Sequence, residues 1–154
     1  MSAERQREAA KAMAPLIAWA RRDEGDVPAL RRALRESLEA YMGFFLGRPA
    51  FARFILWEDL TGAERLRGAR RQATALTDAF DAVRKVAARR GLRRFKVDDA
   101  VLMWIALGYA PVAHQPTLKL ALDRDVTDAA TRRRHIAFAV EQMLFVLAGH
   151  EAGQ

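Results

Sequence analysis

Hydrophobic residues recur along this chain at intervals of three and four, which is the spacing of one face of an α-helix. The longest such stripe follows Gly62 and consists of Leu66, Ala69, Ala73, Leu76, Phe80, Val83 and Ala87. It predicts a long central helix that ends at Gly91, a residue suited to a left-handed C-terminal cap. Thr61 and Glu64 have the spacing of a capping box and predict its start. No stretch alternates apolar and polar residues long enough to predict a strand, so the pattern indicates an all-α fold.

Helical patterns also cover most of the remaining chain. They predict helices over residues 3–22, from Asp26 to near Gly47, from Pro49 onwards, over 99–109 and over 128–147. Pro15 is expected to kink or split the first of these. Residues that can cap a helix N-terminus precede three of them: Asp26, Asp98 and Thr127. Prolines at 111 and 116 predict an irregular connection before the last helix, with a single turn at residues 117–122.

The helix over 99–109 is apolar over much of its circumference, and so is the last helix, where Phe138, Phe145 and Val146 extend the apolar surface beyond one stripe. A helix that is apolar nearly all round must be covered on more than one side. In a chain of this size we expect a second subunit to supply part of that cover.

Length and composition limit the broad class of protein. A chain of 154 residues with 51% hydrophobic and 29% charged residues predicts one globular domain, residues 1–154. Cysteine is absent, which excludes disulfides and thiolate metal sites. No apolar run has the length of a membrane span, and the first residues lack the apolar region of a signal peptide. We therefore expect a cytoplasmic protein with no membrane contact.

The formal net charge of +7 raises the question of a nucleic-acid partner. Seven basic residues lie between Arg84 and Lys96 with only neutral residues among them. They could contact nucleic acid or an acidic partner, or they could be a helix C-terminus, whose dipole favours cations, followed by a solvated loop. The second reading is favoured, because one aromatic residue, Phe95, is too little to stack bases.

Catalytic and metal-binding patterns are lacking. Three histidines stand far apart and at no metal-ligand spacing: His114, His135 and His150. There are two pairs of adjacent acids near helix ends: Glu58–Asp59 and Asp98–Asp99. The two members of each pair would point in different directions on a helix, so they do not form a catalytic dyad. The sequence contains no glycine-rich phosphate loop. We therefore expect neither an enzyme nor a cofactor.

Aromatic residues on segments that should converge are more informative: Tyr41, Phe44, Phe45, Phe54, Trp57, Phe80 and Trp104. They could fill an ordinary core, or they could line an apolar pocket with tyrosine and tryptophan polar groups. Ala69 and Ala73 either allow a neighbouring helix to approach closely or leave room for a guest. The sequence leaves both readings open.

The segment Arg48–Glu58, continuing through Glu64-Arg65-Leu66, resembles the C-terminal regulatory domain of the TetR family of transcriptional regulators. The same holds for Gly91 to Asp98 with the apolar helix after it, the proline-broken connection, and the final helix containing residues 132–138. The resemblance extends from about residue 5 to residue 148 and rests mainly on helix order. It implies a TetR C-terminal-domain-like helical bundle in which the last two long helices form a four-helix dimer interface.

The resemblance also implies roles for individual residues. It implies a homodimer whose interface contains Val101, Ile105, Ile136, Val140, Met143, Leu144 and Leu147. It implies a pocket for a small, largely apolar effector, lined by Tyr41, Phe45, Trp57, Leu76, Phe80 and Met103. In this family, effector binding shifts the first helix of the domain and so changes the spacing of two DNA-reading heads.

The family's helix-turn-helix would precede residue 1 and is missing from this sequence. We therefore expect contact with DNA only through a helix-turn-helix that is not part of this chain. The leading hypothesis is an effector-sensing and dimerisation domain. The alternative is a ligand-free dimerisation or interaction module that pairs with full-length relatives.

Overall fold

A computed structural model describes residues 2–62 and 70–149, and these ranges contain helices and no strand. The all-α prediction is therefore confirmed. The helices are α1 (Ser2–Arg22), α2 (Val27–Leu46), α3 (Pro49–Leu60), α4 (Arg70–Arg89), α5 (Val97–Gly108), α6 (Ala110–Ala113), α7 (Gln115–Leu122) and α8 (Ala129–Ala148).

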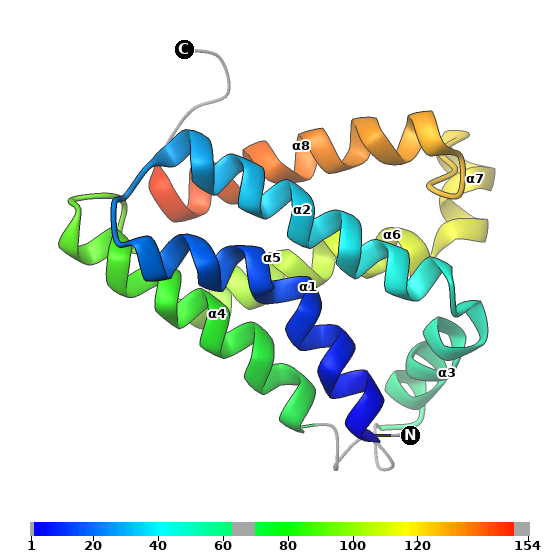
Figure 1. Cartoon of the computed structure of the whole chain (residues 1–154). Helices are drawn as coiled ribbons and strands as arrows, with labels where there is room; N and C mark the ends of the chain where they lie inside the picture. The colour runs from blue at the N-terminus through cyan, green and yellow to red at the C-terminus, as the bar shows by residue number, and fades with distance from the viewer. Residues whose placement is uncertain (1, 63–69, 150–154) are drawn as a thin grey trace.

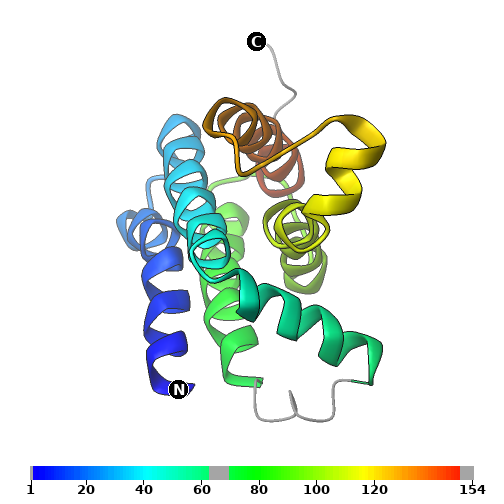
Figure 2. The ribbon, with the colours of Figure 1, turned by 90° about the vertical axis from the view of Figure 1, so that its right-hand side faces the viewer.

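Helix α2 crosses the middle of the molecule, with α1 on one side and α8 on the other (Figure 1). Helix α1 also packs along α4, while α5 contacts both α4 and α8. Helix α3 projects to one side from the end of α2 (Figure 2) and also contacts α6. The interior of the molecule is therefore enclosed by α1, α2, α4, α5 and α8.

Each of these five helices contributes one apolar stripe to a common core. On α2 the predicted stripe is fully buried at Leu30, Leu34 and Leu38. The other four helices also contribute large side chains that are completely buried, among them Trp19 on α1, Phe80 on α4, Trp104 on α5, and Met143, Leu144 and Leu147 on α8. Burial of this apolar surface is the main stabilising contribution to such a bundle.

Two predicted helix ends are confirmed in detail. The Asp26 carboxylate accepts a hydrogen bond from the backbone N–H of Ala29 at 3.2 Å and caps α2. Gly91 follows α4 with φ +70°, and the N–H of Leu92 donates to the carbonyl of Ala87 at 2.9 Å. This is the hydrogen bond expected of a left-handed C-terminal cap.

Other local predictions need correction. Helix α1 runs unbroken across Pro15, so the split does not occur, and Figure 1 shows α1 bending near its middle. Asp98 lies in the first turn of α5 instead of capping it, and the cap position is held by Lys96. Thr127 does not cap α8, because the carboxylate of the next residue, Asp128, accepts from the N–H of Thr131 at 2.7 Å.

The proline-containing connection is more regular than predicted. It forms two short helices, α6 and α7, and each carries its proline within the first two positions. A proline there loses no intrahelical hydrogen bond, because the first N–H groups of a helix have no partner in any case. Of the predicted capping box, Glu64 lies outside the described residues, while the Thr61 hydroxyl donates to the Trp57 carbonyl at the end of α3.

Candidate functional site

Aromatic side chains from α2, α4 and α5 meet in the core. The Trp104 ring lies 5.6 Å from the Tyr41 ring and 5.6 Å from the Phe80 ring, both in edge-to-face geometry. Phe45 adds edge-to-face contacts to Tyr41 at 5.1 Å and to Tyr109 at 5.0 Å. We refer to Tyr41, Phe45, Phe80, Trp104 and Tyr109 as the aromatic cluster. Three of the six predicted pocket residues belong to it.

The other three predicted pocket residues differ in position. Leu76 is buried on α4, one turn before Phe80, and Met103 is partly buried on α5. Trp57 lies on α3, where 49% of its surface is exposed and its ring packs against Phe54 at 6.5 Å. Since α3 projects from the bundle, the structure leaves Trp57 outside the aromatic cluster.

The polar groups of the aromatic cluster are not equally satisfied. The Tyr109 hydroxyl donates to the carbonyl of Ala52 at 3.0 Å. Burial, together with the nearby Tyr109, raises the pKa of Tyr41, so its phenol stays protonated at neutral pH. Trp104 is completely buried, and its indole Nε1 has no hydrogen-bond partner among the described residues. The sequence placed Trp104 among the converging aromatic residues, but a helix apolar on all sides did not show which of its faces points inward.

The α8 residues predicted for the dimer interface lie in the core of a single chain. These five residues are 0–3% exposed within that chain and belong to its own core: Ile136, Val140, Met143, Leu144 and Leu147. The reason is that α8 packs against α2, α4 and α5, which together cover its most regular stripe. On α5, Val101 is partly buried and Ile105 is exposed.

Four large apolar residues on α5 and α8 face the solvent, and one of them, Ile105, also belongs to the predicted interface. Leu102 and Ile105 on α5 are 68% and 38% exposed, and Phe138 and Phe145 on α8 are 50% and 45% exposed. Phe138 and Phe145 are seven residues apart and therefore share one side of α8. We refer to these four residues as the exposed apolar set. The sequence already pointed to the two phenylalanines, because they extend the apolar surface of the last helix beyond its main stripe.

One short contact ties the two helices of the exposed apolar set together. Nε2 of the buried His135 on α8 lies 2.6 Å from the backbone carbonyl oxygen of Leu107 on α5. A carbonyl only accepts, so the ring carries its proton on Nε2 in this contact. His135 therefore helps to hold the relative position of α5 and α8.

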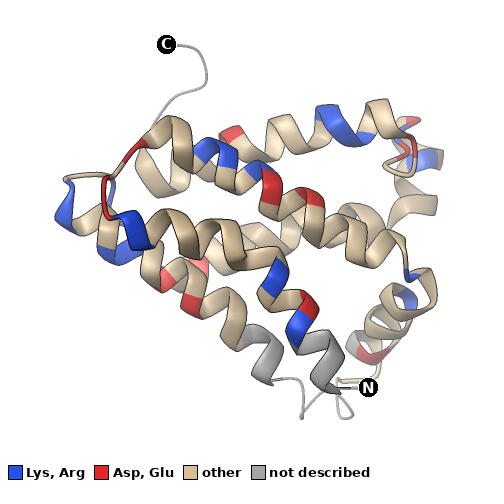
Figure 3. Ribbon diagram, viewed as in Figure 1, with Lys and Arg blue, Asp and Glu red and all other residues tan. Residues whose placement is uncertain are grey.

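Ion pairs partly neutralise the basic run that follows the middle of α4. Arg84 and Lys85 pair with Asp81 at 2.6 and 2.8 Å, and Arg89 pairs with Asp23 at 3.1 Å. Figure 3 shows basic and acidic residues side by side where α1 and α4 end. These pairs support the reading of the run as a helix terminus and loop rather than a nucleic-acid surface.

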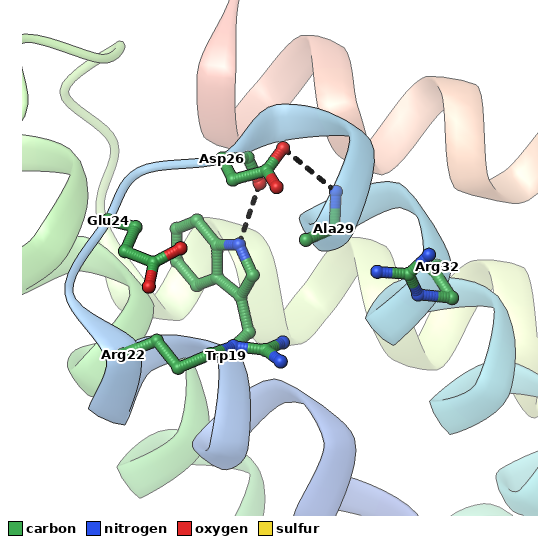
Figure 4. A pocket seen from close by; sticks show the side chains of 6 residues that line it. All are labelled: Trp19, Arg22, Glu24, Asp26, Ala29 and Arg32. Carbon is green, nitrogen blue, oxygen red and sulfur yellow. Dashed lines mark hydrogen bonds between the residues drawn. The ribbon is translucent and has the colours of Figure 1, made fainter.

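A small hollow lies at the turn between α1 and α2 (Figure 4). It has a volume of about 80 Å³ and is lined by Trp19, Arg22, Glu24, Asp26, Ala29 and Arg32. Trp19 Nε1 donates to the Asp26 carbonyl at 2.8 Å, so its indole is satisfied within the turn. Ligand pockets are usually about 300–1,000 Å³. This hollow is therefore too small for a typical small-molecule ligand.

A second, larger hollow lies at the surface, between the end of α7 and the start of α8. Its volume is about 340 Å³, and it is lined by Leu122, Asp123, Arg124, Thr131 and Arg134. Most of these side chains are exposed and none is aromatic. It does not match the apolar pocket that the family resemblance implies.

Among the described residues, no group of three or more His, Asp or Glu side chains could hold a metal ion. In that part of the chain, no helix is long and apolar enough to cross a membrane.

The sequence matches the family described as Tetracyclin repressor-like, C-terminal domain, over residues 31–143. The matched stretch begins in α2, ends in α8 and includes the whole aromatic cluster. The chain belongs to this family. No curated protein and no solved structure matches it. The TetR-like C-terminal domain suggested by helix order is thus confirmed.

Proposed function

We propose that this TetR-like domain is the effector-sensing and dimerisation part of a transcriptional regulator, and that it binds a small, largely apolar molecule. The family match across the helices that carry the aromatic cluster is the observation on which the proposal rests. The proposal makes the protein a cytoplasmic regulator without a catalytic role.

The helix contacts support an effector-sensing role for the aromatic cluster. Trp104 on α5 touches Tyr41 on α2 and Phe80 on α4, so one guest molecule would contact three helices. Helix α1 packs along both α2 and α4. A guest that changes the spacing of α2 and α4 therefore changes the surface on which α1 packs. Its binding would increase the population of molecules in which α1 is displaced.

The exposed apolar set supports self-association. In an isolated chain these four large side chains remain in contact with water on two helices that pack against each other. A second copy that presents the same surface would cover them through a two-fold axis, which is the most frequent arrangement of homodimers. We place the dimer interface on these residues and not on the buried stripe of α8.

Sedimentation of a charge variant tests the interface. Phe138→Glu would place an unpaired carboxylate in the contact, which costs several kcal/mol. We expect the wild-type chain to sediment as a dimer at tens of micromolar and this variant as a monomer with unchanged helical circular dichroism. Leu120→Glu is the matched control, because Leu120 on α7 is 90% exposed and lies outside the exposed apolar set. A monomeric wild type, or a dimeric Phe138→Glu, would show that the interface is misplaced.

Thermal unfolding in the presence of small aromatic and aliphatic compounds tests effector binding. A ligand at 100 times its dissociation constant stabilises the folded state by about 2.7 kcal/mol. We expect at least one compound to raise the melting temperature of the wild-type domain. The increase should be lost when a bulky residue of the aromatic cluster, such as Phe80, is replaced by alanine.

One observation favours the second candidate, a dimerisation module without a ligand. The rings of the aromatic cluster already touch one another at 5.0–5.6 Å between centroids, so they fill the space that a guest would occupy. Such a module would pair with relatives of the same family. It predicts a stable dimer whose melting temperature no compound raises.

A further inference from the structure

We infer that the indole N–H of Trp104 is the polar recognition group of the effector site, and that the effector is a neutral, flat apolar molecule with one hydrogen-bond acceptor. The inference rests on the proposed function, and it adds the chemical class of the ligand and the side chain that reads it.

Trp104 is an exception among the buried aromatic side chains that carry a polar group. Trp19 donates its N–H to the Asp26 carbonyl at 2.8 Å, and Tyr109 donates its hydroxyl to the Ala52 carbonyl at 3.0 Å. Trp104 is 0% exposed, and within the part of the chain that the structure describes its Nε1 has no hydrogen-bond partner. Buried donors are nearly always hydrogen-bonded, and leaving one unpaired destabilises the folded state. A ligand that places an acceptor atom against this N–H would remove the cost of leaving it unpaired.

In residues 2–62 and 70–149, two other buried side-chain polar atoms among those described lack hydrogen-bond partners, and neither is an equally good recognition group. The Ser37 hydroxyl can turn about its own bond toward a carbonyl of its helix. His135 Nδ1 belongs to a ring whose other nitrogen already contacts the Leu107 carbonyl. The Trp104 N–H is part of a rigid ring between two other rings, so it cannot reach a partner without moving the whole side chain.

The side chains around Trp104 determine the shape and charge that a ligand must have. Its ring contacts are with Tyr41 and Phe80, which offer ring edges and faces and no charge. A flat apolar guest gains favourable contacts with such rings. Burying an ion without a counter-charge is costly. The matching acceptor is therefore uncharged, as in a ketone, ester, ether or nitro group.

Tyr41 controls access to Trp104. Of the two rings against Trp104, Phe80 is completely buried, whereas Tyr41 is partly exposed. The Tyr41 ring lies over Gly108 of α5, where a Cβ atom would come within 2.8 Å of Tyr41 Cδ1. The missing Cβ lets the ring lie against the α5 backbone. In the proposed bound state, a turn of the Tyr41 side chain would open a path to the indole, and the guest would take the place of the ring.

A matched pair of probes tests the inference. Acetophenone and ethylbenzene have nearly the same size and shape, and only acetophenone carries a carbonyl. We expect calorimetry to show that the wild-type domain binds acetophenone about tenfold more tightly, which corresponds to about 1.4 kcal/mol for one buried hydrogen bond. Trp104→Phe keeps an aromatic ring and removes the N–H, so it should bind both probes equally. Trp19→Phe is the control and should keep the tenfold preference.

An NMR measurement on the wild-type chain avoids dependence on the folding of any variant. In a ¹⁵N-labelled sample, acetophenone should move the indole N–H resonance of Trp104 downfield, and ethylbenzene should move it far less. Without ligand, Trp104→Phe should lower the melting temperature less than Trp19→Phe, because both leave a similar cavity and only Trp19→Phe also loses a hydrogen bond, the one to Asp26.

The outcomes separate this inference from the proposed function. Equal binding of the two probes, with an unmoved Trp104 resonance, overturns the role of the N–H and leaves an apolar effector site in place. The same holds if Trp104→Phe keeps the preference for acetophenone. If neither probe binds at millimolar concentration, the inference is overturned, and the compound set described above decides the proposed function independently.

Discussion

Substitutions at two neighbouring residues of α8, Leu144 and Phe145, test which side of this helix lies in the core and which side is free to form an interface. Leu144 is 0% exposed, and Phe145 is 45% exposed with the guanidinium of Arg93 4.8 Å from its ring centroid. Replacing each by alanine removes apolar contacts from opposite sides of one helix. The two changes should therefore differ strongly in their effect on the free energy of unfolding.

The expected magnitudes follow from burial. Leu144→Ala removes three carbon atoms from a closed site, at about 0.8 kcal/mol each, and leaves a cavity behind. The total cost is about 3 to 5 kcal/mol. Phe145→Ala removes a side chain that keeps almost half its surface in water, together with an exposed cation–π contact of about 0.5 kcal/mol. Its cost to the monomer is about 1 kcal/mol.

Urea unfolding followed by circular dichroism measures both changes. The background should be Phe138→Glu, because a monomeric background removes the concentration dependence that dimerisation adds to stability. We expect a large fall in the urea midpoint for Leu144→Ala and a small one for Phe145→Ala. Similar losses for the two variants would refute the orientation of α8. If Leu144→Ala in the otherwise wild-type chain changed only self-association, that result would restore the interface predicted from the sequence.

Two local features give further predictions. The Thr127 hydroxyl and backbone N–H, with Lys119, lower the pKa of Asp125 to about 2. Its carboxylate therefore stabilises the fold above the unfolded pKa of about 4 and loses this effect as the pH falls toward 2. Asp125→Asn should flatten that part of the curve of melting temperature against pH, and an unchanged curve would contradict the assignment. Gly91→Ala should cost about 1–2 kcal/mol in urea unfolding because φ is +70° there. The control Gly43→Ala, in an open helical position, should instead stabilise by about 0.5–1 kcal/mol.

Most of the fold was predictable because helices are local. The stripe on α2 and the caps at Asp26 and Gly91 depend on residues at most five positions apart, and all three are confirmed. The errors lie where neighbouring residues compete. Thr127 and Asp128 are both good caps, and the sequence could not show that the second one begins α8.

The candidate site was only partly predictable. Tyr41, Phe45 and Phe80 were expected to meet, and they do, but Trp57 remains outside because α3 projects from the bundle. The unpaired Trp104 N–H could not be foreseen, since a missing partner depends on every neighbour of the ring. The sequence gives no information on which acceptors lie within reach of a side chain.

The sequence by itself determined the helices, their order and the family, because apolar periodicity, prolines and capping residues act over a few positions of the chain. Only the tertiary structure decided which apolar face of α8 is buried. That helix has two such faces, and the packing of α2, α4 and α5 against one of them leaves Phe138 and Phe145 on the other. Those three helices come earlier in the chain, and no local pattern within α8 records where they lie.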